Sequence, residues 1–193
     1  MLKRPAQGGF SLIELATAIT ILAILMMLSM PSISEYLQNA RLGAAAQSFY
    51  SGLNLARSEA IRRNGPVEFA MTSTPIAAGV ENTLTPDTSG KNWVVRRRPS
   101  ASDPYDSPPI DSKTALEGGG STPNVTVTAT EAIVTFDSLG NAVTGIGTIA
   151  LKNPAAGLCV PAGPVRCWDV RVAPGGQVHL CDPAASLGDS RAC

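Results

Sequence analysis

The sequence predicts an α+β protein in which one long N-terminal helix packs against an antiparallel β-sheet domain. Two patterns favour this fold. An apolar run begins at Phe10 and passes into a helical stripe of apolar residues, spaced alternately by four and three, that ends at Ala60. Short segments rich in β-branched residues, separated by turn residues, follow it. A length of 193 residues suits one compact domain plus an N-terminal element outside its core.

The overall charge argues against a general nucleic-acid binder. Fifteen basic and fifteen acidic residues cancel, so the chain lacks the broad positive potential that attracts phosphates. Any such binding would depend on a local patch. Apolar residues make up 44% of the chain, but many of them lie between Phe10 and Met30, which leaves the remainder more polar.

The segment from Phe10 to Met30 is predicted to be the transmembrane half of the helix. It holds one charged residue, Glu14, and a helix of about 21 residues rises about 30 Å, enough to cross the hydrocarbon layer. Lys3 and Arg4 precede it, which places the N-terminus in the cytoplasm and the rest outside. A secretory signal peptide is the alternative, but the run is long for a signal core and Gly8-Gly9 precedes it instead of following it.

Glu14 needs an explanation, because a carboxylate inside a spanning helix costs about 2 to 3 kcal/mol on insertion scales. It could lie close enough to the cytoplasmic interface to reach water. Alternatively, it could meet a positive partner within the bilayer. A new α-amino group would be such a partner if the chain were cut just before Phe10.

The start of the apolar run resembles the processing site of type IV prepilins and type II secretion pseudopilins. The residues that carry the resemblance are Gly9-Phe10-Ser11-Leu12-Ile13-Glu14-Leu15. It implies that a prepilin peptidase removes a leader, residues 1–9, by cutting between Gly9 and Phe10, and that Phe10 is then N-methylated. It also implies that Glu14 pairs with a neighbouring subunit's N-terminal amine during assembly. Pro31 matches the proline that commonly kinks these helices.

The helix is expected to continue beyond the membrane as an amphipathic half, residues 31–64. Its apolar stripe should face the sheet. The stripe consists of Leu42, Ala46, Phe49, Leu53, Ala56 and Ala60. Asn64-Gly65-Pro66 is expected to end the helix, with Gly65 in a left-handed cap conformation and Pro66 unable to continue it.

A β-rich periplasmic domain is expected over residues 65–193. Its predicted strands are Val67 to Met71, Asn92 to Arg97, Val125 to Thr130, Ala132 to Phe136, Thr148 to Leu151, Trp168 to Val172 and Gln177 to Leu180. Between Pro99 and Pro123 the content of Ser, Pro, Asp and Gly predicts an irregular, mobile insertion.

Three further stretches resemble the GspH/FimT family of minor pseudopilins. They are Ala56-Arg57-Ser58-Glu59-Ala60-Ile61, Val134-Thr135-Phe136-Asp137-Ser138-Leu139-Gly140 and Gly175-Gly176-Gln177-Val178-His179-Leu180-Cys181-Asp182-Pro183. The resemblance implies a type IV pilin-like fold and a structural subunit in the tip or initiating complex of a type IV pilus or type II secretion pseudopilus. It also implies a single-pass protein of the bacterial inner membrane. The implied partners are other pilins or pseudopilins, the prepilin peptidase/methyltransferase, the inner-membrane assembly platform and membrane lipid.

Four cysteines lie near the C-terminus: Cys159, Cys167, Cys181 and Cys193. Zinc binding is one interpretation, but the spacing does not resemble paired CxxC knuckles, and an exported domain meets an oxidising compartment. We therefore expect two disulfides and no metal. Three pairings are possible, and the two sequence-local ones, Cys159 with Cys167 and Cys181 with Cys193, are favoured because each closes a short loop.

Enzymatic function finds little support in the sequence. The chain has one histidine, His179, in a predicted strand, where a structural role is expected rather than acid-base catalysis. No catalytic residue and no cofactor is expected.

DNA binding is the alternative function, because some FimT-like subunits carry a Gly-Arg-x-Arg motif associated with DNA uptake. The corresponding residues here, 176–179, lack both arginines. Another basic cluster, Arg96-Arg97-Arg98, follows Trp93 and could contact phosphate while the aromatic ring stacks on a base. The simpler interpretation is a solvated strand end with Trp93 in the core.

Overall fold

The structure is a computed structural model that describes residues 11–76, 84–98, 108–114, 124–186 and 188–193, with the backbone alone for residues 28–32. The chain divides into two compact units, Met1–Leu37 and Gln38–Cys193. Helix α1 (Leu12–Arg63) contributes to both. This helix agrees with the length expected from the sequence, and its backbone remains helical at Pro31.

The first unit consists, in its described part, of the N-terminal portion of α1. Its large apolar side chains are exposed, among them Leu12, Ile13, Leu15, Ile19, Leu22, Ile24 and Met27. Among the described residues, no helix is both long enough and apolar enough to qualify as a membrane span. The span predicted from Phe10 to Met30 therefore remains a proposal.

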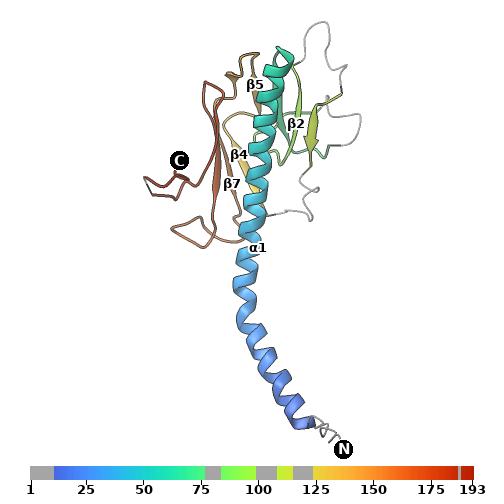
Figure 1. Cartoon of the computed structure of the whole chain (residues 1–193), viewed down its shortest axis with the longest axis vertical. Coiled ribbons are helices and arrows are strands. Elements are labelled where there is room, and N and C mark those ends of the chain that lie inside the picture. Colours follow the sequence, from blue (N-terminus) through green and yellow to red (C-terminus); the bar gives the residue numbers. More distant parts are fainter. Residues whose placement is uncertain (1–10, 77–83, 99–107, 115–123, 187) are drawn as a thin grey trace, which may run out of the picture. The chain divides into compact units, whose positions relative to one another are not determined.

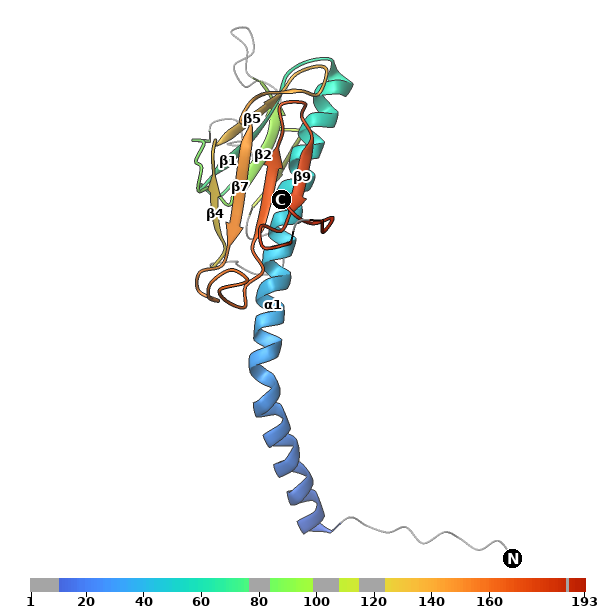
Figure 2. The same cartoon turned by 90° about the vertical axis from the view of Figure 1, so that its left-hand side faces the viewer.

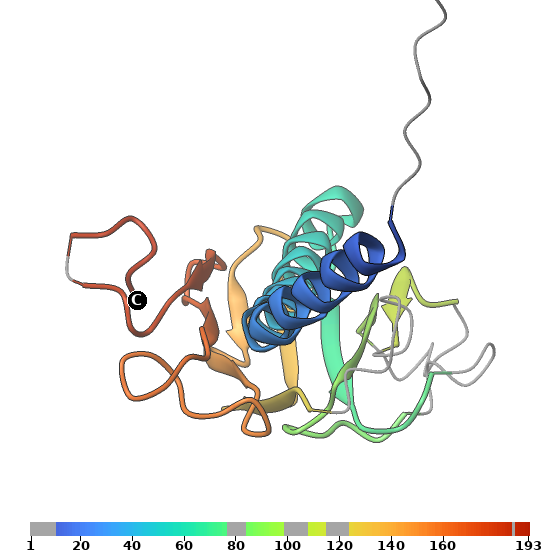
Figure 3. The same cartoon turned by 90° about the horizontal axis from the view of Figure 1, so that it is seen from below.

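In the second unit, α1 lies against two antiparallel sheets (Figure 1). The first sheet consists, in spatial order, of β3 (Asp111–Lys113), β2 (Asn92–Arg97), β1 (Val67–Thr72), β5 (Ile133–Phe136) and β6 (Ala142–Thr144). The second consists of β4 (Thr126–Ala129), β7 (Gly147–Lys152), β8 (Trp168–Val172) and β9 (Val178–Cys181). Figure 2 shows the second sheet, and Figure 3 shows both sheets beneath the helix, with strands of the second sheet to the left and strands of the first to the right.

The core of this unit forms where the helix meets both sheets. All six residues of the predicted apolar stripe are at most 3% exposed, so the expected sheet-facing side of α1 is confirmed. Phe49 packs edge-on against Phe69, and Phe69 lies 5.5 Å from Trp93 between ring centroids. Gly52 permits this close approach, because a Cβ there would lie 2.8 Å from the Phe69 ring.

The end of α1 differs from expectation in one residue. Asn64, not Gly65, takes the left-handed conformation, with φ of 48°. Its N–H donates to the carbonyl of Ile61, and the N–H of Gly65 donates to that of Ala60, which is the Schellman arrangement. Asparagine tolerates this conformation better than most residues, so the prediction for Gly65 was wrong by one position.

Glu59 makes the end of the helix sensitive to acid. Arg62 and Arg63 donate hydrogen bonds to its carboxylate at 2.6 to 2.9 Å, and these bonds lower its pKa to about 2. Because folding lowers the pKa of Glu59, its ionised carboxylate stabilises the folded state fully at pH values above the unfolded pKa of 4.5. This stabilisation is lost as the pH falls towards the folded pKa of about 2. We expect the stability difference between wild type and Glu59→Gln to shrink across that range in urea titrations. A constant difference would contradict this.

The strands of the second sheet and the three central strands of the first agree with the sequence prediction, and the two edge strands of the first sheet differ. Each of the seven predicted strands is present, within two residues at either end. The edge strands β3 and β6 were missed, because three residues carry too short a pattern to recognise. β3 lies within the insertion predicted to be irregular and pairs with β2, so that prediction was wrong for residues 111–113. The remaining described residues of this insertion are 108–110 and 114.

Candidate functional site

The predicted processing and assembly residues lie at the start of the first unit. Gly9 and Phe10 are outside the described residues, so the cleavage site remains a prediction. Glu14 lies in the first turn of α1 with its side chain exposed, and the positive end of the helix dipole favours an acid there. Pro31 lies within the helix, in the segment for which the structure describes the backbone alone.

The three stretches with family resemblance meet at one place in the second unit, which we call the turn joint. Arg57 of α1 donates from Nε to the carbonyl of Gly140 at 3.0 Å and from Nη2 to that of Gly175 at 3.4 Å. Gly140 follows β5, and Gly175 lies between β8 and β9. One arginine thus holds a turn of each sheet against the helix.

The backbones of the two turns are also in close contact at the joint. Gly176 has φ of 70°, and a Cβ on it would lie 1.7 Å from the carbonyl oxygen of Gly140. The N–H of Ala142 donates to the carbonyl of Pro174 at 3.1 Å. The joint is therefore a structural feature, and the sequence motifs at this place serve packing.

The turn after β5 is held in shape by Asp137. Its carboxylate accepts hydrogen bonds from the N–H groups of Leu139 and Asn141. The bond from Asn141 is the main cause that lowers the pKa of Asp137. This keeps the carboxylate ionised and the Gly140 carbonyl directed at Arg57.

The four cysteines form two disulfides, Cys159–Cys167 and Cys181–Cys193. These are the two sequence-local pairings favoured above. Within the described residues, no group of three or more His, Cys, Asp or Glu side chains could hold a metal ion.

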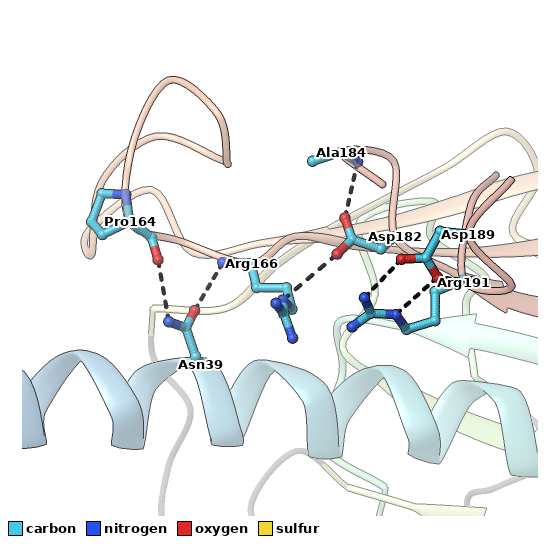
Figure 4. A network of polar contacts seen from close by, with 7 residues as sticks. All are labelled: Asn39, Pro164, Arg166, Asp182, Ala184, Asp189 and Arg191. Atoms are coloured by element: carbon cyan, nitrogen blue, oxygen red, sulfur yellow. Dashed lines mark hydrogen bonds and ion pairs between the residues drawn. The ribbon is translucent and has the colours of Figure 1, made fainter. Parts of the chain in front are cut away.

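A polar network joins both disulfide loops to α1 (Figure 4). The amide of Asn39 donates to the carbonyl of Pro164 and accepts from the N–H of Arg166. The Arg166 side chain pairs with the buried carboxylate of Asp182 at 3.6 Å. Sequence reasoning missed this network, because the three elements that form it are far apart along the chain.

The C-terminal loop contributes a second ion pair to the same region. Arg191 donates to both carboxylate oxygens of Asp189, which lowers the pKa of Asp189 to about 2. The backbone carbonyl of Arg191 accepts from the N–H of Asp182 at 2.7 Å. The last residues of the chain therefore return to the end of β9.

We expect replacement of both Cys181 and Cys193 with alanine to lower the free energy of unfolding by about 2 to 4 kcal/mol, the usual range for a disulfide. Urea unfolding of the full chain, followed by tryptophan fluorescence, measures this. The matched change at Cys159 and Cys167 closes a shorter loop, of 8 instead of 12 residues, so its effect should be slightly smaller or equal. Unchanged unfolding midpoints in both variants would contradict the stabilising role.

His179 lies on β9, exposed and opposite Arg171 of β8. Both residues line a cleft of about 510 Å³, together with the C-terminal residues Ser190, Ala192 and Cys193. Arg171 donates to the carbonyl of Cys193 at 2.8 Å and lies 3.5 Å from the carboxylate of Asp169. Arg171 therefore binds the C-terminus. His179 occupies an exposed strand position, and its structural role stays a prediction.

The basic cluster at the end of β2 is not a continuous exposed patch. Arg96 is 4% exposed and its Nε lies 3.4 Å from the Glu68 carboxylate. Arg98 lies 3.8 Å from the same group, and Arg97 is exposed. Trp93 is buried and donates to Ser48 at 3.0 Å, so it offers no ring for a base. The simpler interpretation, with Trp93 in the core, is therefore confirmed for that residue. Arg96 lies on the opposite face of β2, beside Glu68, so the two residues do not form one nucleic-acid contact.

Comparison with known families gives two matches on this chain. A family model described as type II transport protein GspH matches residues 45–176. The chain belongs to the GspH family. The prokaryotic N-terminal methylation motif matches residues 4–30 of this GspH-family chain, which includes the predicted cleavage site.

Solved structures with a similar fold include two pilin-like proteins. The type IV minor pilin FimU of Pseudomonas aeruginosa has a TM-score of 0.50 and 17% identity, over 75% of the GspH-family chain and 91% of FimU. The minor pseudopilin EpsH from the type 2 secretion system of Vibrio cholerae has a TM-score of 0.43 and 16% identity, over 75% and 99%. The first likeness supports the α+β fold alone. No curated protein sequence matches the chain.

Proposed function

We propose that this chain is a minor pilin or pseudopilin, a non-enzymatic subunit that assembles through its N-terminal helix into a type IV pilus or type II secretion pseudopilus. One observation carries the proposal. A single helix, α1, connects most of the methylation motif, residues 4–30, to the start of the GspH match, residues 45–176. The motif would be the site of cleavage and methylation, and the GspH domain would form the surface of the assembled subunit.

The exposed apolar side chains on the first unit support an assembly role. A helix that is apolar on all sides needs lipid or other protein around it. In the proposed cycle, the precursor is held in the inner membrane with its C-terminal domain in the periplasm. After cleavage and methylation, other pilins or pseudopilins replace the lipid around the helix as the assembly platform moves it into the filament.

In this cycle, Glu14 positions each subunit against its neighbour. After cleavage, Phe10 carries a new α-amino group four residues before Glu14. An ion pair between this amine on one subunit and Glu14 on its neighbour offsets the cost of each charge in an apolar filament core. The same pair sets the axial position of one helix against the next.

Replacing Gly9 with valine tests the processing step. A β-branched side chain at the residue before the cut should block the peptidase, so the precursor should accumulate in the membrane at full length. Immunoblots of membrane and sheared-filament fractions measure this. Valine in place of Gly8 is the matched control and should be processed. Normal processing of both variants would contradict cleavage after Gly9.

A further inference from the structure

The loop of residues 153–167 presents two apolar side chains to solvent, those of Leu158 and Val160, and we call this pair its apolar tip. Leu158 is 68% exposed and Val160 is 41% exposed. Exposed apolar residues that stand singly need no explanation. Val160 lies within the segment that the Cys159–Cys167 disulfide closes, and Leu158 directly precedes it, so covalent structure constrains the backbone at both positions.

Hydrogen bonds hold this loop in a fixed shape. The N–H of Val160 donates to the carbonyl of Val165 at 2.8 Å, and the N–H of Val165 donates to that of Leu158 at 3.2 Å. The amide of Asn39 binds the loop backbone on both sides of Val165 (Figure 4). The Asn153 side chain donates to that of Gln38 at 3.3 Å.

These contacts place the loop at one end of the second unit. Gln38 and Asn39 are the first two residues of that unit, so the loop lies where the chain arrives from the N-terminal helix. Asn39 follows Met30, the end of the apolar run, by about nine residues, or a helical rise of about 14 Å. The headgroup layer extends roughly 5 to 8 Å beyond the hydrocarbon on each side. By chain length alone, Asn39 is about 6 to 9 Å beyond that layer, a distance that two or three extended loop residues can span.

The charge around the tip suits one kind of surface. Residues 152–168 contain no Asp or Glu. Lys152 is exposed, and the Arg166 side chain is 51% exposed while that of its partner Asp182 is 10% exposed. The accessible charge is therefore positive. An apolar tip beside cations is the pattern that binds an anionic bilayer surface.

We propose that the loop of residues 153–167 rests on the anionic headgroup layer of the membrane that holds the precursor, with Leu158 and Val160 between the headgroups. The inference rests on the membrane anchor proposed above. The contact holds the second unit at the bilayer before assembly, and it must break when the subunit is extracted.

Tryptophan placed in the tip tests the contact. The full chain carrying Leu158→Trp is reconstituted in phosphatidylethanolamine/phosphatidylglycerol vesicles whose acyl chains are brominated close to the headgroup, and in the same vesicles without bromine. Leu139→Trp is the matched control. Leu139 is 78% exposed and lies beside Gly140 near the C-terminal end of α1, about 33 Å of helix away from Asn39.

We expect bromine to quench the tryptophan fluorescence of the Leu158→Trp chain more than that of wild type, whose signal comes from Trp93 and Trp168. The emission of the Leu158→Trp chain should also shift to shorter wavelength. The Leu139→Trp chain should show only the wild-type level. Adding Lys152→Glu to the Leu158→Trp chain should reduce the quenching, because it places a negative charge against the anionic lipid.

Two results would overturn the inference. Quenching of the Leu158→Trp chain at the wild-type level, as expected for Leu139→Trp, would show that the tip does not touch lipid. A blue shift at position 158 without bromine quenching would mean that protein covers the loop instead. Vesicle flotation tests the membrane anchor independently of the loop contact. A chain that floats with the vesicles but shows no quenching would contradict the loop contact alone. A chain that does not float would contradict the anchor as well.

Discussion

Replacing Glu14 with alanine should leave cleavage and membrane insertion intact but reduce recovery of the subunit in filaments at least tenfold. Without Glu14, the neighbour's N-terminal amine would be left unpaired in an apolar core. Removing one partner of a buried ion pair typically costs about 3 to 5 kcal/mol, and each 1.4 kcal/mol is a factor of ten in an equilibrium. Immunoblots of sheared filaments or of pseudopili, with the membrane fraction as reference, measure the ratio.

Two variants make this result specific. Glu14→Gln keeps the shape of the side chain and loses its charge, so it should fail as Glu14→Ala does. Glu35→Ala removes an exposed acid farther along the helix and should assemble normally. If Glu14 merely reaches water at the interface, the Glu14→Ala chain should assemble at the wild-type level, which would contradict the pairing.

Replacing Gly176 with alanine is expected to lower the free energy of unfolding by roughly 2 to 5 kcal/mol. A left-handed backbone costs a residue with a Cβ about 1 to 2 kcal/mol, and overpacking adds about 1 to 3. The added Cβ would lie 1.7 Å from the Gly140 carbonyl oxygen, so one of the two turns must move. That movement would also break the bond from Arg57 to Gly140.

The neighbouring Gly175 provides the control. A Cβ there would meet nothing within 4 Å, so Gly175→Ala should change stability by about 0.5 kcal/mol or less. Urea unfolding followed by the fluorescence of Trp93 and Trp168 compares the two chains. Equal midpoints for both variants would show that the turns are not closely packed.

The sequence predicted the helix and the strands of four or more residues because their patterns are long enough to recognise. The stripe from Leu42 to Ala60 covers several helical turns, and all of it is buried as expected. The helix end was misassigned by one residue because Asn64 and Gly65 can both adopt the left-handed conformation. Three-residue edge strands such as β6 carry no pattern long enough to recognise.

The contacts that organise the second unit could not be read from the chain. Arg57 lies 83 residues from Gly140 and 118 from Gly175, and nothing local in the sequence marks which carbonyls it will bind. The motif around Arg57 did carry a signal, since it was one of three stretches with family resemblance. Those stretches were recognised separately, and only the fold shows that they meet.

The basic cluster illustrates the opposite case, in which a pattern suggested more than the fold supports. Consecutive arginines on a strand point alternately to its two faces. Arg96 therefore lies on the same face as its cross-strand partner Glu68, and Arg97 lies on the face of Trp93 and Val95, exposed at the end of the strand. A strand assignment for Asn92 to Arg97, made correctly from sequence, already contained the reason why the three arginines do not form one patch.

The central claim is that the mature subunit begins at Phe10. Mass spectrometry of the N-terminal peptide, taken from the chain recovered in the membrane and filament fractions of its native host, tests it most directly. We predict a peptide that begins at Phe10 and carries one methyl group on its α-amine. A chain that still begins at Met1, or one cut near Ser29 to Ser32 as a secretory signal peptide would be, would contradict the account.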